Sequence, residues 1–190
     1  MDEGRAAGRD VEANRRQTKY SRADQLRRVL WSVGRLAFAA VPRPLYGLRA
    51  AILRLHGARV GRHCQIYPTV RIFAPWQLEI GDWSAVGDRV ILYNLGAIRI
   101  GCRVTISQNA HLCAGTHDHH DPAMPLIRAR IAVEDDAWVC ADAFVGPDVV
   151  VGQAAVVGAR AVVMRSVAPR AVVAGNPARP IGRRPNPGGT

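Results

Sequence analysis

The stretch "VEDDAWVCADAFVGPDVVVGQAAVVGARAVV" (residues 133–163) carries a valine at every sixth position, from Val133 to Val163. An amphipathic helix would repeat its apolar residues about every 3.6 positions, and a single strand would alternate them every second position. A period of six fits neither element. It is typical of a solenoid in which each six-residue unit forms one short wall and one corner, and in which three units close a coil.

The period extends toward the N-terminus, where aliphatic anchors, the first residues of the units, occur in further sets of three. The fifth residue of each unit is usually small or aliphatic, and the pleat of a strand turns it inward together with the next anchor. Glycine is frequent at the second position, where we expect it to permit the tight turns of the corners. The pattern predicts an all-β fold, a parallel β-helix of about five coils. Its anchors are Val60, Ile66, Ile72, Ile80, Val86, Leu92, Ile100, Ile106, Leu112, Val133, Val139, Val145, Val151, Val157 and Val163.

The composition narrows the class of protein. The 190 residues are 48% hydrophobic and 22% charged, which predicts one soluble globular domain. A net charge of +11 favours an anionic partner, but no helix-turn-helix, zinc-finger or aromatic RNA-binding motif is visible, so we expect no nucleic acid partner. The first residues lack an apolar leader, and the apolar run 29–41 is too short to span a bilayer, so we expect a cytoplasmic protein.

The regions outside the repeat divide the chain further. Residues 1–20 are charged and aperiodic, which predicts disorder. Residues 21–57 show helical spacing and should form a helical cap over the first coil. A second interpretation is that residues 21–56 contact an anionic membrane at the inner face, as basic amphipathic helices can. The repeat occupies residues 58–178, and residues 179–190 should form a C-terminal tail.

The period fails in "LCAGTHDHHDPAMPLIRARI" (residues 112–131). The next anchor should lie near position 120 but comes at Val133, so we expect a loop inserted at one corner, within residues 116–130. Positions five and seven of the unit anchored at Leu112 point inward, so His117 at position six should point outward. It stands at the fixed base of the loop, and a rigid platform suits a catalytic base.

A family resemblance extends over about residues 28–181 and is carried by six segments: "LWSVGRLAFAAVPRPLYGLRAAILRLHGARVG", "VGDRVILYNLGAIRIG", "ISQNAHLCAGTHDHHDP", "AWVCADAFVGP", "VVGARAVV" and "VVAGNPARPI". The chain resembles the hexapeptide-repeat acyltransferases, and among them the colanic acid biosynthesis acetyltransferase group. The resemblance implies a left-handed β-helix and a homotrimer with each active site between two subunits. It also implies direct transfer of acetyl from acetyl-CoA to a hydroxyl of a saccharide or a lipid-linked saccharide, without a metal, in exopolysaccharide or glycoconjugate biosynthesis.

The same resemblance implies roles for single residues. His117 in "CAGTHD" matches the general base. Asp118 is assigned to the substrate side, although either Asp118 or Asp121 could orient the imidazole or only solvate the loop. Asn94 matches a position that contacts the acceptor.

The donor side is implied in the same way. Small residues would line the path of the pantetheine arm, an aromatic residue would stand beside the active site, and arginines suit phosphates because the guanidinium forms paired hydrogen bonds. The expected donor-binding residues are Ala141, Ala159, Trp138, Arg160, Arg165 and Arg179.

Two other functions stay open at this point. A zinc-dependent lyase of the carbonic anhydrase type uses the same fold and would need converging histidines, and the cluster His111, His117, His119 and His120 raises it. Those histidines crowd one strand and one loop, however, whereas that family draws its ligands from separate coils. A non-catalytic hexapeptide scaffold is the other alternative, and it predicts no binding of acetyl-CoA.

Overall fold

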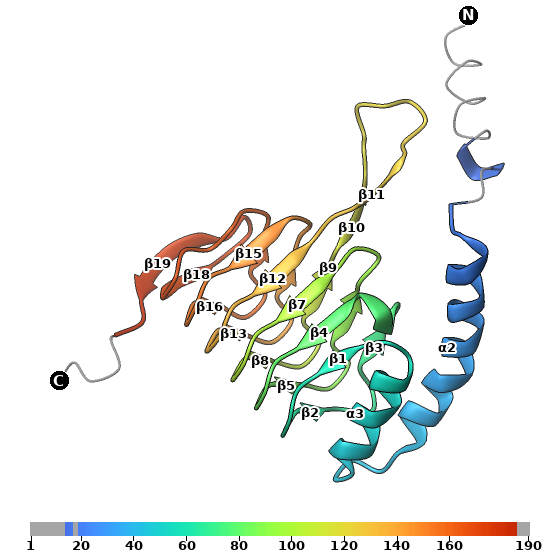
Figure 1. The fold of residues 1–190 in the computed structure, drawn as a ribbon. Coiled ribbons are helices and arrows are strands. Elements are labelled where there is room, and N and C mark those ends of the chain that lie inside the picture. Colours follow the sequence, from blue (N-terminus) through green and yellow to red (C-terminus); the bar gives the residue numbers. More distant parts are fainter. Residues whose placement is uncertain (1–13, 17–18, 186–190) are drawn as a thin grey trace, which may run out of the picture.

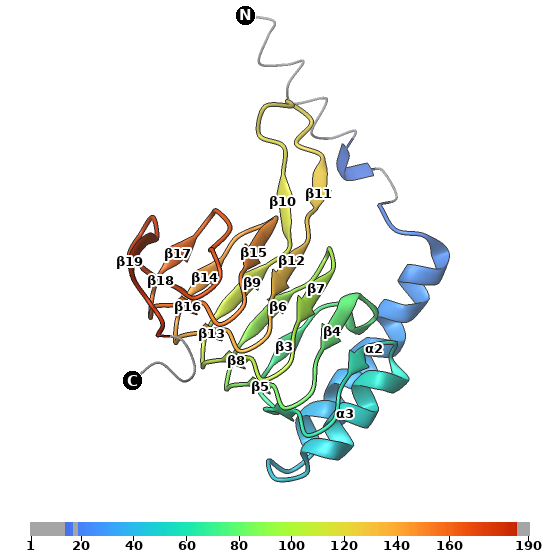
Figure 2. The same cartoon turned by 60° about the vertical axis from the view of Figure 1, so that its left-hand side comes forward.

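The computed structural model describes residues 14–16 and 19–185, and within them the chain winds into a column with three walls (Figures 1 and 2). Each wall is a parallel sheet whose strands come from successive coils. Wall A consists of β1 (Arg59–Val60), β4 (Leu78–Ile80), β7 (Ile98–Ile100), β12 (Ile131–Val133) and β15 (Val149–Val151). Wall B consists of β2 (Gln65–Ile66), β5 (Ala85–Val86), β8 (Thr105–Ile106), β13 (Trp138–Val139), β16 (Val156–Val157), β18 (Ala171–Ala174) and the antiparallel β19 (Arg179–Arg183). Wall C consists of β3 (Arg71–Ile72), β6 (Ile91–Tyr93), β9 (His111–Cys113), β14 (Phe144–Val145) and β17 (Val162–Val163).

The chain runs from wall A to wall B to wall C and back, and we name the corners AB, BC and CA accordingly. Five coils are complete, and a sixth is begun by a bridge between Val151 and Val167 and by β18. Strand β19 then folds back on β18, so residues 179–183, which we predicted as part of a tail, belong to the sheet. Most of the stretch predicted to be disordered lies outside the described residues.

The interior confirms the predicted repeat. Every anchor is buried, and the most exposed, Val60, shows 7% of its surface. Anchors stack in register, as Ile80 on Ile100 and Ile100 on Val133 do in wall A. Each coil therefore covers the edge of the one below with apolar side chains and backbone hydrogen bonds, which leaves only the two ends of the column open.

The corners correct the role that we predicted for glycine. The left-handed backbone is adopted at corner AB by non-glycine residues such as Trp83 (φ 62°) and Asp136 (φ 62°). The glycines serve stacking instead. A Cβ added to Gly81 would lie 2.6 Å from the carbonyl carbon of Gly101 in the next coil, so only glycine allows the coils to approach so closely.

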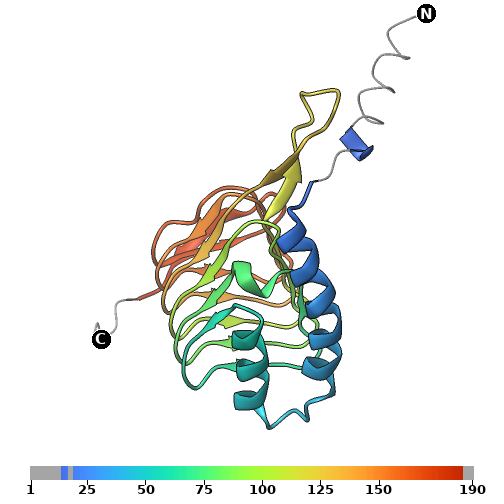
Figure 3. The same ribbon diagram turned by 45° about the vertical axis from the view of Figure 1, so that its right-hand side comes forward.

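Helices α2 (Arg22–Ala40) and α3 (Tyr46–Leu55) precede the column along the chain. Helix α3 packs on β1 and β2, while α2 runs along the side of the column (Figure 3). Helix α2 begins at Ser21, whose hydroxyl accepts from the N–H of Asp24. Trp31 anchors α2, since its indole N–H donates to the carbonyl of Ile72 at 2.8 Å.

The outer face of α2 carries the aliphatic residues whose helical spacing we noted. They point away from the column rather than into it and are more than half exposed: Leu26, Val29, Leu30, Val33 and Leu36. No helix in the described part of the chain is long and apolar enough to cross a membrane.

The inserted segment is a hairpin rather than an irregular loop. Strands β10 (Gly115–His117) and β11 (Leu126–Arg128) pair in antiparallel fashion and project from corner CA between β9 and β12 (Figure 2). Pro122 and Pro125 lie in the connection between the two strands, where neither has to donate a ladder hydrogen bond. The column continues undisturbed beneath the hairpin.

Candidate active site at the hairpin

His117 ends strand β10, and its side chain is exposed, as predicted. The ring atom Nδ1 lies 2.6 Å from the carbonyl oxygen of Met124, across the hairpin. Because a carbonyl oxygen can only accept, this contact requires the proton on Nδ1 and leaves the lone pair on Nε2. The imidazole is therefore held in the tautomer that a general base needs.

The aspartates that we considered as orienting groups do not contact this ring. Asp118 accepts from the N–H of His120 at 2.9 Å, and Asp121 accepts from the N–H of Ala123 at 2.8 Å. Both carboxylates stabilise the hairpin turn. The orienting group is a backbone carbonyl, that of Met124, and nothing in the sequence marks a residue for that role.

Asn94 corrects our prediction for the acceptor side. Its side chain is fully buried, and its oxygen accepts from the N–H groups of Phe73 and Ala74 at 3.0 Å each. Its amide nitrogen donates to the carbonyl of Ala74. Asn94 thus closes corner CA between two coils and does not face an acceptor. The coil period places residue 94 above residue 74, and that period is the signal that could have revealed its role.

The predicted donor-binding residues fall into two groups. Ala141 and Arg160 meet at corner BC, where the N–H of Arg160 donates to the carbonyl of Ala141 at 2.9 Å, and Ala159 is exposed beside them. Trp138 projects from wall B near this corner, half exposed, and donates to the hydroxyl of Ser107.

The second group is at the C-terminal end of the column. Arg165, at corner CA, and Arg179, in β19, line one cavity of about 600 Å³. The other lining residues are mostly small or apolar, among them Val163, Ala171 and Pro177. The cavity combines two cations with an apolar surface.

The outer face of wall C lies between the two corners and is mostly apolar. Ile91, His111, Phe144 and Val162 follow one another in register from coil to coil, and each is half-buried. The His111 ring stands edge-on to Phe144 at 5.2 Å between centroids. Its Nε2 is buried and has no hydrogen-bond partner among the described residues. Burial, and then the charge of Arg71, lower the pKa of His111 below its ordinary value.

Sequence comparison places the chain among known proteins. It is 43% identical over 154 residues to WcaF of Escherichia coli K12, named as a colanic acid biosynthesis acetyltransferase, and the match covers 81% of this chain and 85% of the relative. The protein of the same name from Shigella flexneri matches equally well. The chain belongs to the WcaF family of acetyltransferases. No family model matches it.

Solved structures agree with the fold of this WcaF-family chain. A hexapeptide-repeat acetyltransferase of Vibrio cholerae, complexed with acetyl coenzyme A, superimposes with a TM-score of 0.79 at 22% identity over 89% of this chain and 93% of that one. A galactoside acetyltransferase in complex with coenzyme A gives 0.80 at 19% identity over 93% and 90%. The fold is thus the left-handed parallel β-helix that we predicted, with about one coil more.

The histidines of this WcaF-family chain do not converge on one point. His111 lies on wall C, and the ring of His117 contacts the carbonyl of Met124. The rings of His119 and His120, in the hairpin connection, are tilted by 39° with their centroids 4.0 Å apart. Within the ranges that the structure describes, no group of three or more histidine, cysteine, aspartate or glutamate residues could hold a metal ion. The geometry gives the zinc-lyase alternative no support.

Proposed function

We propose that this chain is an acetyl-CoA-dependent O-acetyltransferase that acetylates a saccharide hydroxyl, with His117 as the general base. One observation carries the proposal: His117 is exposed at the end of β10, in the last strand pair of the hairpin, and its Nδ1–H is committed to the carbonyl of Met124. The family of the chain and the solved relatives complexed with acetyl-CoA or CoA support the donor.

In the proposed reaction, Nε2 of His117 accepts the proton of the acceptor hydroxyl as its oxygen attacks the acetyl carbonyl carbon. The new C–O bond forms and the C–S bond of the thioester breaks. The imidazolium then returns its proton to the leaving thiolate, so no covalent enzyme intermediate is needed. A base of this kind contributes about 10²–10⁴-fold in rate.

The residues present fit the donor. Its phosphates need cations, which Arg165 and Arg179 supply at the cavity near the last coil, and its pantetheine arm needs an apolar path. Ala141 and Ala159 at corner BC leave room for such an arm to lie close to the backbone.

We further propose a homotrimer. His117 is at corner CA and Ala159 is at corner BC, so one chain cannot bring the two together across wall C. If the apolar outer face of wall C packs against sister chains, corner CA of one copy meets corner BC of the next, and His111 and Phe144 become buried. A closed ring of three such interfaces would build three sites.

Mixed trimers test the shared site. Co-expressed His117→Ala and Ala159→Trp chains are each expected to be inactive alone. In a random equal mixture, about one site in four combines an intact His117 with an intact Ala159, so about a quarter of wild-type activity should return. No recovery in mixed trimers would refute a site shared between copies, and a monomer in solution would refute the trimer.

The main test replaces the base. His117→Ala should lower kcat about 10²–10⁴-fold in a thiol-release assay over a panel of saccharides, while calorimetry shows unchanged CoA binding. The matched control is His119→Ala in the same hairpin, which should retain activity. Full activity of His117→Ala would remove this histidine from the mechanism, and failure to bind CoA would favour the scaffold alternative. Activity that a chelator abolishes would revive the metal alternative.

Membrane contact through residues 21–56 stays a prediction. The aliphatic outer face of α2 offers the apolar surface, and Arg22 and Arg27 offer the positive charge, that such contact requires. Co-sedimentation with anionic but not with neutral vesicles would support it, and the variant Leu30→Glu should abolish it.

A further inference from the structure

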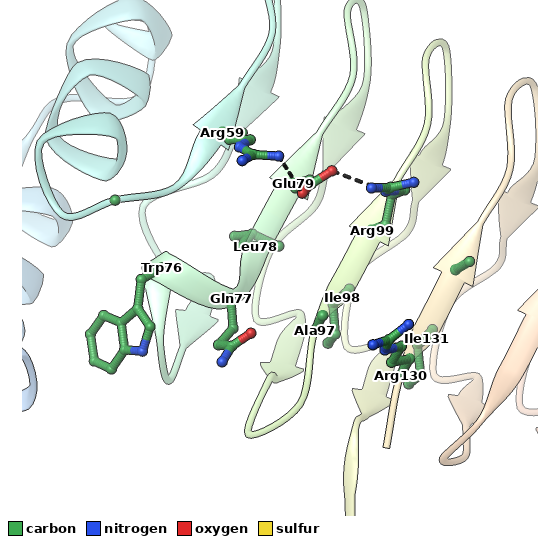
Figure 4. Close-up of a pocket in the computed structure, with 12 residues that line it drawn as sticks. Arg59, Trp76, Gln77, Leu78, Glu79, Ala97, Ile98, Arg99, Arg130 and Ile131 are labelled. Carbon is green, nitrogen blue, oxygen red and sulfur yellow. Dashed lines mark hydrogen bonds and ion pairs between the residues drawn. The ribbon is translucent and has the colours of Figure 1, made fainter. Parts of the chain in front are cut away.

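A hollow of about 520 Å³ lies on the outer face of wall A, beside the root of the hairpin (Figure 4). Its floor consists of backbone and of small residues, since Gly57, Ala97 and Ala132 stand where larger side chains would fill it. Long polar side chains surround this floor. The hollow belongs neither to the His117 hairpin nor to the cavity near the last coil.

The charges around the hollow do not balance. Glu79 accepts from Arg59 at 3.0 Å and from Arg99 at 2.9 Å, so two guanidinium groups flank one carboxylate (Figure 4). Arg130 adds a third guanidinium, exposed and without an ion pair or hydrogen bond among the described residues. Three cations against one anion leave a net charge of +2 on the rim of one concave surface.

The ion pairs with Glu79 hold the arginines only weakly. The side chains of Arg59 and Arg99 are 81% and 70% exposed, and pairs so exposed contribute little in water. An anion that binds in the hollow can therefore take one guanidinium away from Glu79 at little cost in free energy. The paired N–H donors of a guanidinium group match the spacing of the oxygens in carboxylate and phosphate groups.

The position of Arg130 is fixed by the root of the hairpin. The N–H of Ile131 donates to the carbonyl of Ala97 at 3.0 Å, and Gly96 allows the carbonyl of Ala129 to approach closely. The segment that carries His117 and the residue that faces the hollow are thus parts of one rigid insertion. Arg130 is four positions after Leu126, the partner of His117, and two positions after the end of β11, which corresponds to a span of about 13 Å of extended chain.

We infer that this hollow is a subsite for an anionic saccharide acceptor, in which Arg99 and Arg130 bind an acidic group on a sugar unit neighbouring the acetylated one. The inference rests on the proposed function and makes it more specific. The span of about 13 Å fits an oligosaccharide that reaches from the hollow toward His117 better than a single sugar. The acidic group could be a carboxylate on a uronic acid or a phosphate on a sugar carrier, since the shared chemistry is an anion borne by a saccharide.

The experiment uses the full-length assembled enzyme and the double variant Arg99→Gln/Arg130→Gln. The control is Arg62→Gln, because Arg62 is 84% exposed, lies at corner AB and does not line the hollow. The probes are an oligosaccharide with a uronic acid, the same oligosaccharide with the uncharged hexose, and a sugar phosphate. Binding is measured by calorimetry and turnover by thiol release.

We expect the wild type to bind at least one of the two acidic probes more tightly than the uncharged one. The double variant should lose about tenfold in affinity per arginine for that probe, with the effect in KM rather than kcat, and should bind CoA and the uncharged probe normally. Which acidic probe is preferred identifies the source of the anion.

Equal binding of the acidic and uncharged probes by the wild type would overturn the inference, as would a double variant that behaves like the Arg62 control. The calorimetric measurement of probe binding does not depend on catalysis. If acetyl transfer fails with every acceptor while the acidic probe still binds through Arg99 and Arg130, the subsite stands and the proposed reaction falls.

Discussion

Gly96 holds the root of the hairpin, and replacing it offers a demanding test of the site. Its N–H donates to the carbonyl of Ala114 at 3.0 Å. A Cβ added at Gly96 would stand 1.7 Å from the carbonyl oxygen of Ala129 and 3.0 Å from that of Ala114. These two residues are the entry and exit of the hairpin. The backbone of Gly96 does not have a positive φ, so steric overlap is the only reason that alanine is excluded.

The magnitude follows from the geometry. Real Cβ contacts are not shorter than 3.0 Å, so the exit strand must move by about 1.3 Å to relieve the contact at 1.7 Å. A misplacement of about 1 Å typically costs about 10²-fold in rate. We therefore expect Gly96→Ala to lower kcat about 10²-fold, with a loss of about 1–3 kcal/mol in the free energy of unfolding from overpacking.

The assay compares kcat from thiol release, CoA affinity from calorimetry and the melting temperature. CoA affinity should stay within about twofold, because Arg165 and Arg179 lie near the last coil. The matched control is Gly47→Ala in helix α3, where an added Cβ meets nothing within 4 Å. A Gly96→Ala enzyme with the kcat of the wild type would refute the view that the hairpin positions the base.

Two further predictions concern stability. The pKa of His111 is below its ordinary value of 6.5, so the unfolded chain takes up this proton at higher pH than the folded one. The free energy of unfolding should therefore decrease as the pH falls below about 6.5, and urea titrations should show a smaller decrease for His111→Phe; equal pH dependence of both proteins would contradict this. Arg49 is fully buried and donates to the carbonyls of Val41, Pro42, Arg43 and Ile66. Arg49→Met should cost about 3 kcal/mol or more because these acceptors lose their donor, and a change below about 1 kcal/mol in denaturant unfolding would show that water replaces the guanidinium.

The column could be predicted from the sequence because its core repeats coil by coil along a single axis. Each coil packs only against its neighbours, so the requirement for an apolar anchor recurs at a fixed spacing and can be counted along the chain. The hairpin was visible for the same reason, as a gap in that count between Leu112 and Val133. The outward position of His117 followed from the pleat.

Interactions between coils were harder to predict. Resemblance alone assigns Asn94 to the acceptor side, but its partners Phe73 and Ala74 lie one coil away. The proton on His117 is fixed by a backbone carbonyl, which no side-chain pattern encodes. The aliphatic residues on the outer face of α2 have the same helical spacing as those of a buried face. This spacing shows which residues share one side of the helix, but not whether that side is buried or exposed.

In the homotrimer that we propose, the position of wall C between corners BC and CA is the reason that one chain alone would not form a complete site. In a three-walled column, the side chains that point outward diverge from one corner to the next. The proposed base at corner CA and the proposed donor path at corner BC therefore face different directions on one column. A second column laid against wall C, as in the proposed trimer, would turn these two corners toward each other. The half-buried row around His111, whose Nε2 has no partner among the described residues, marks the face where that second column would lie. In such a trimer, wall A would remain exposed to solvent beside the hairpin, where the proposed acceptor would reach both the hollow and His117.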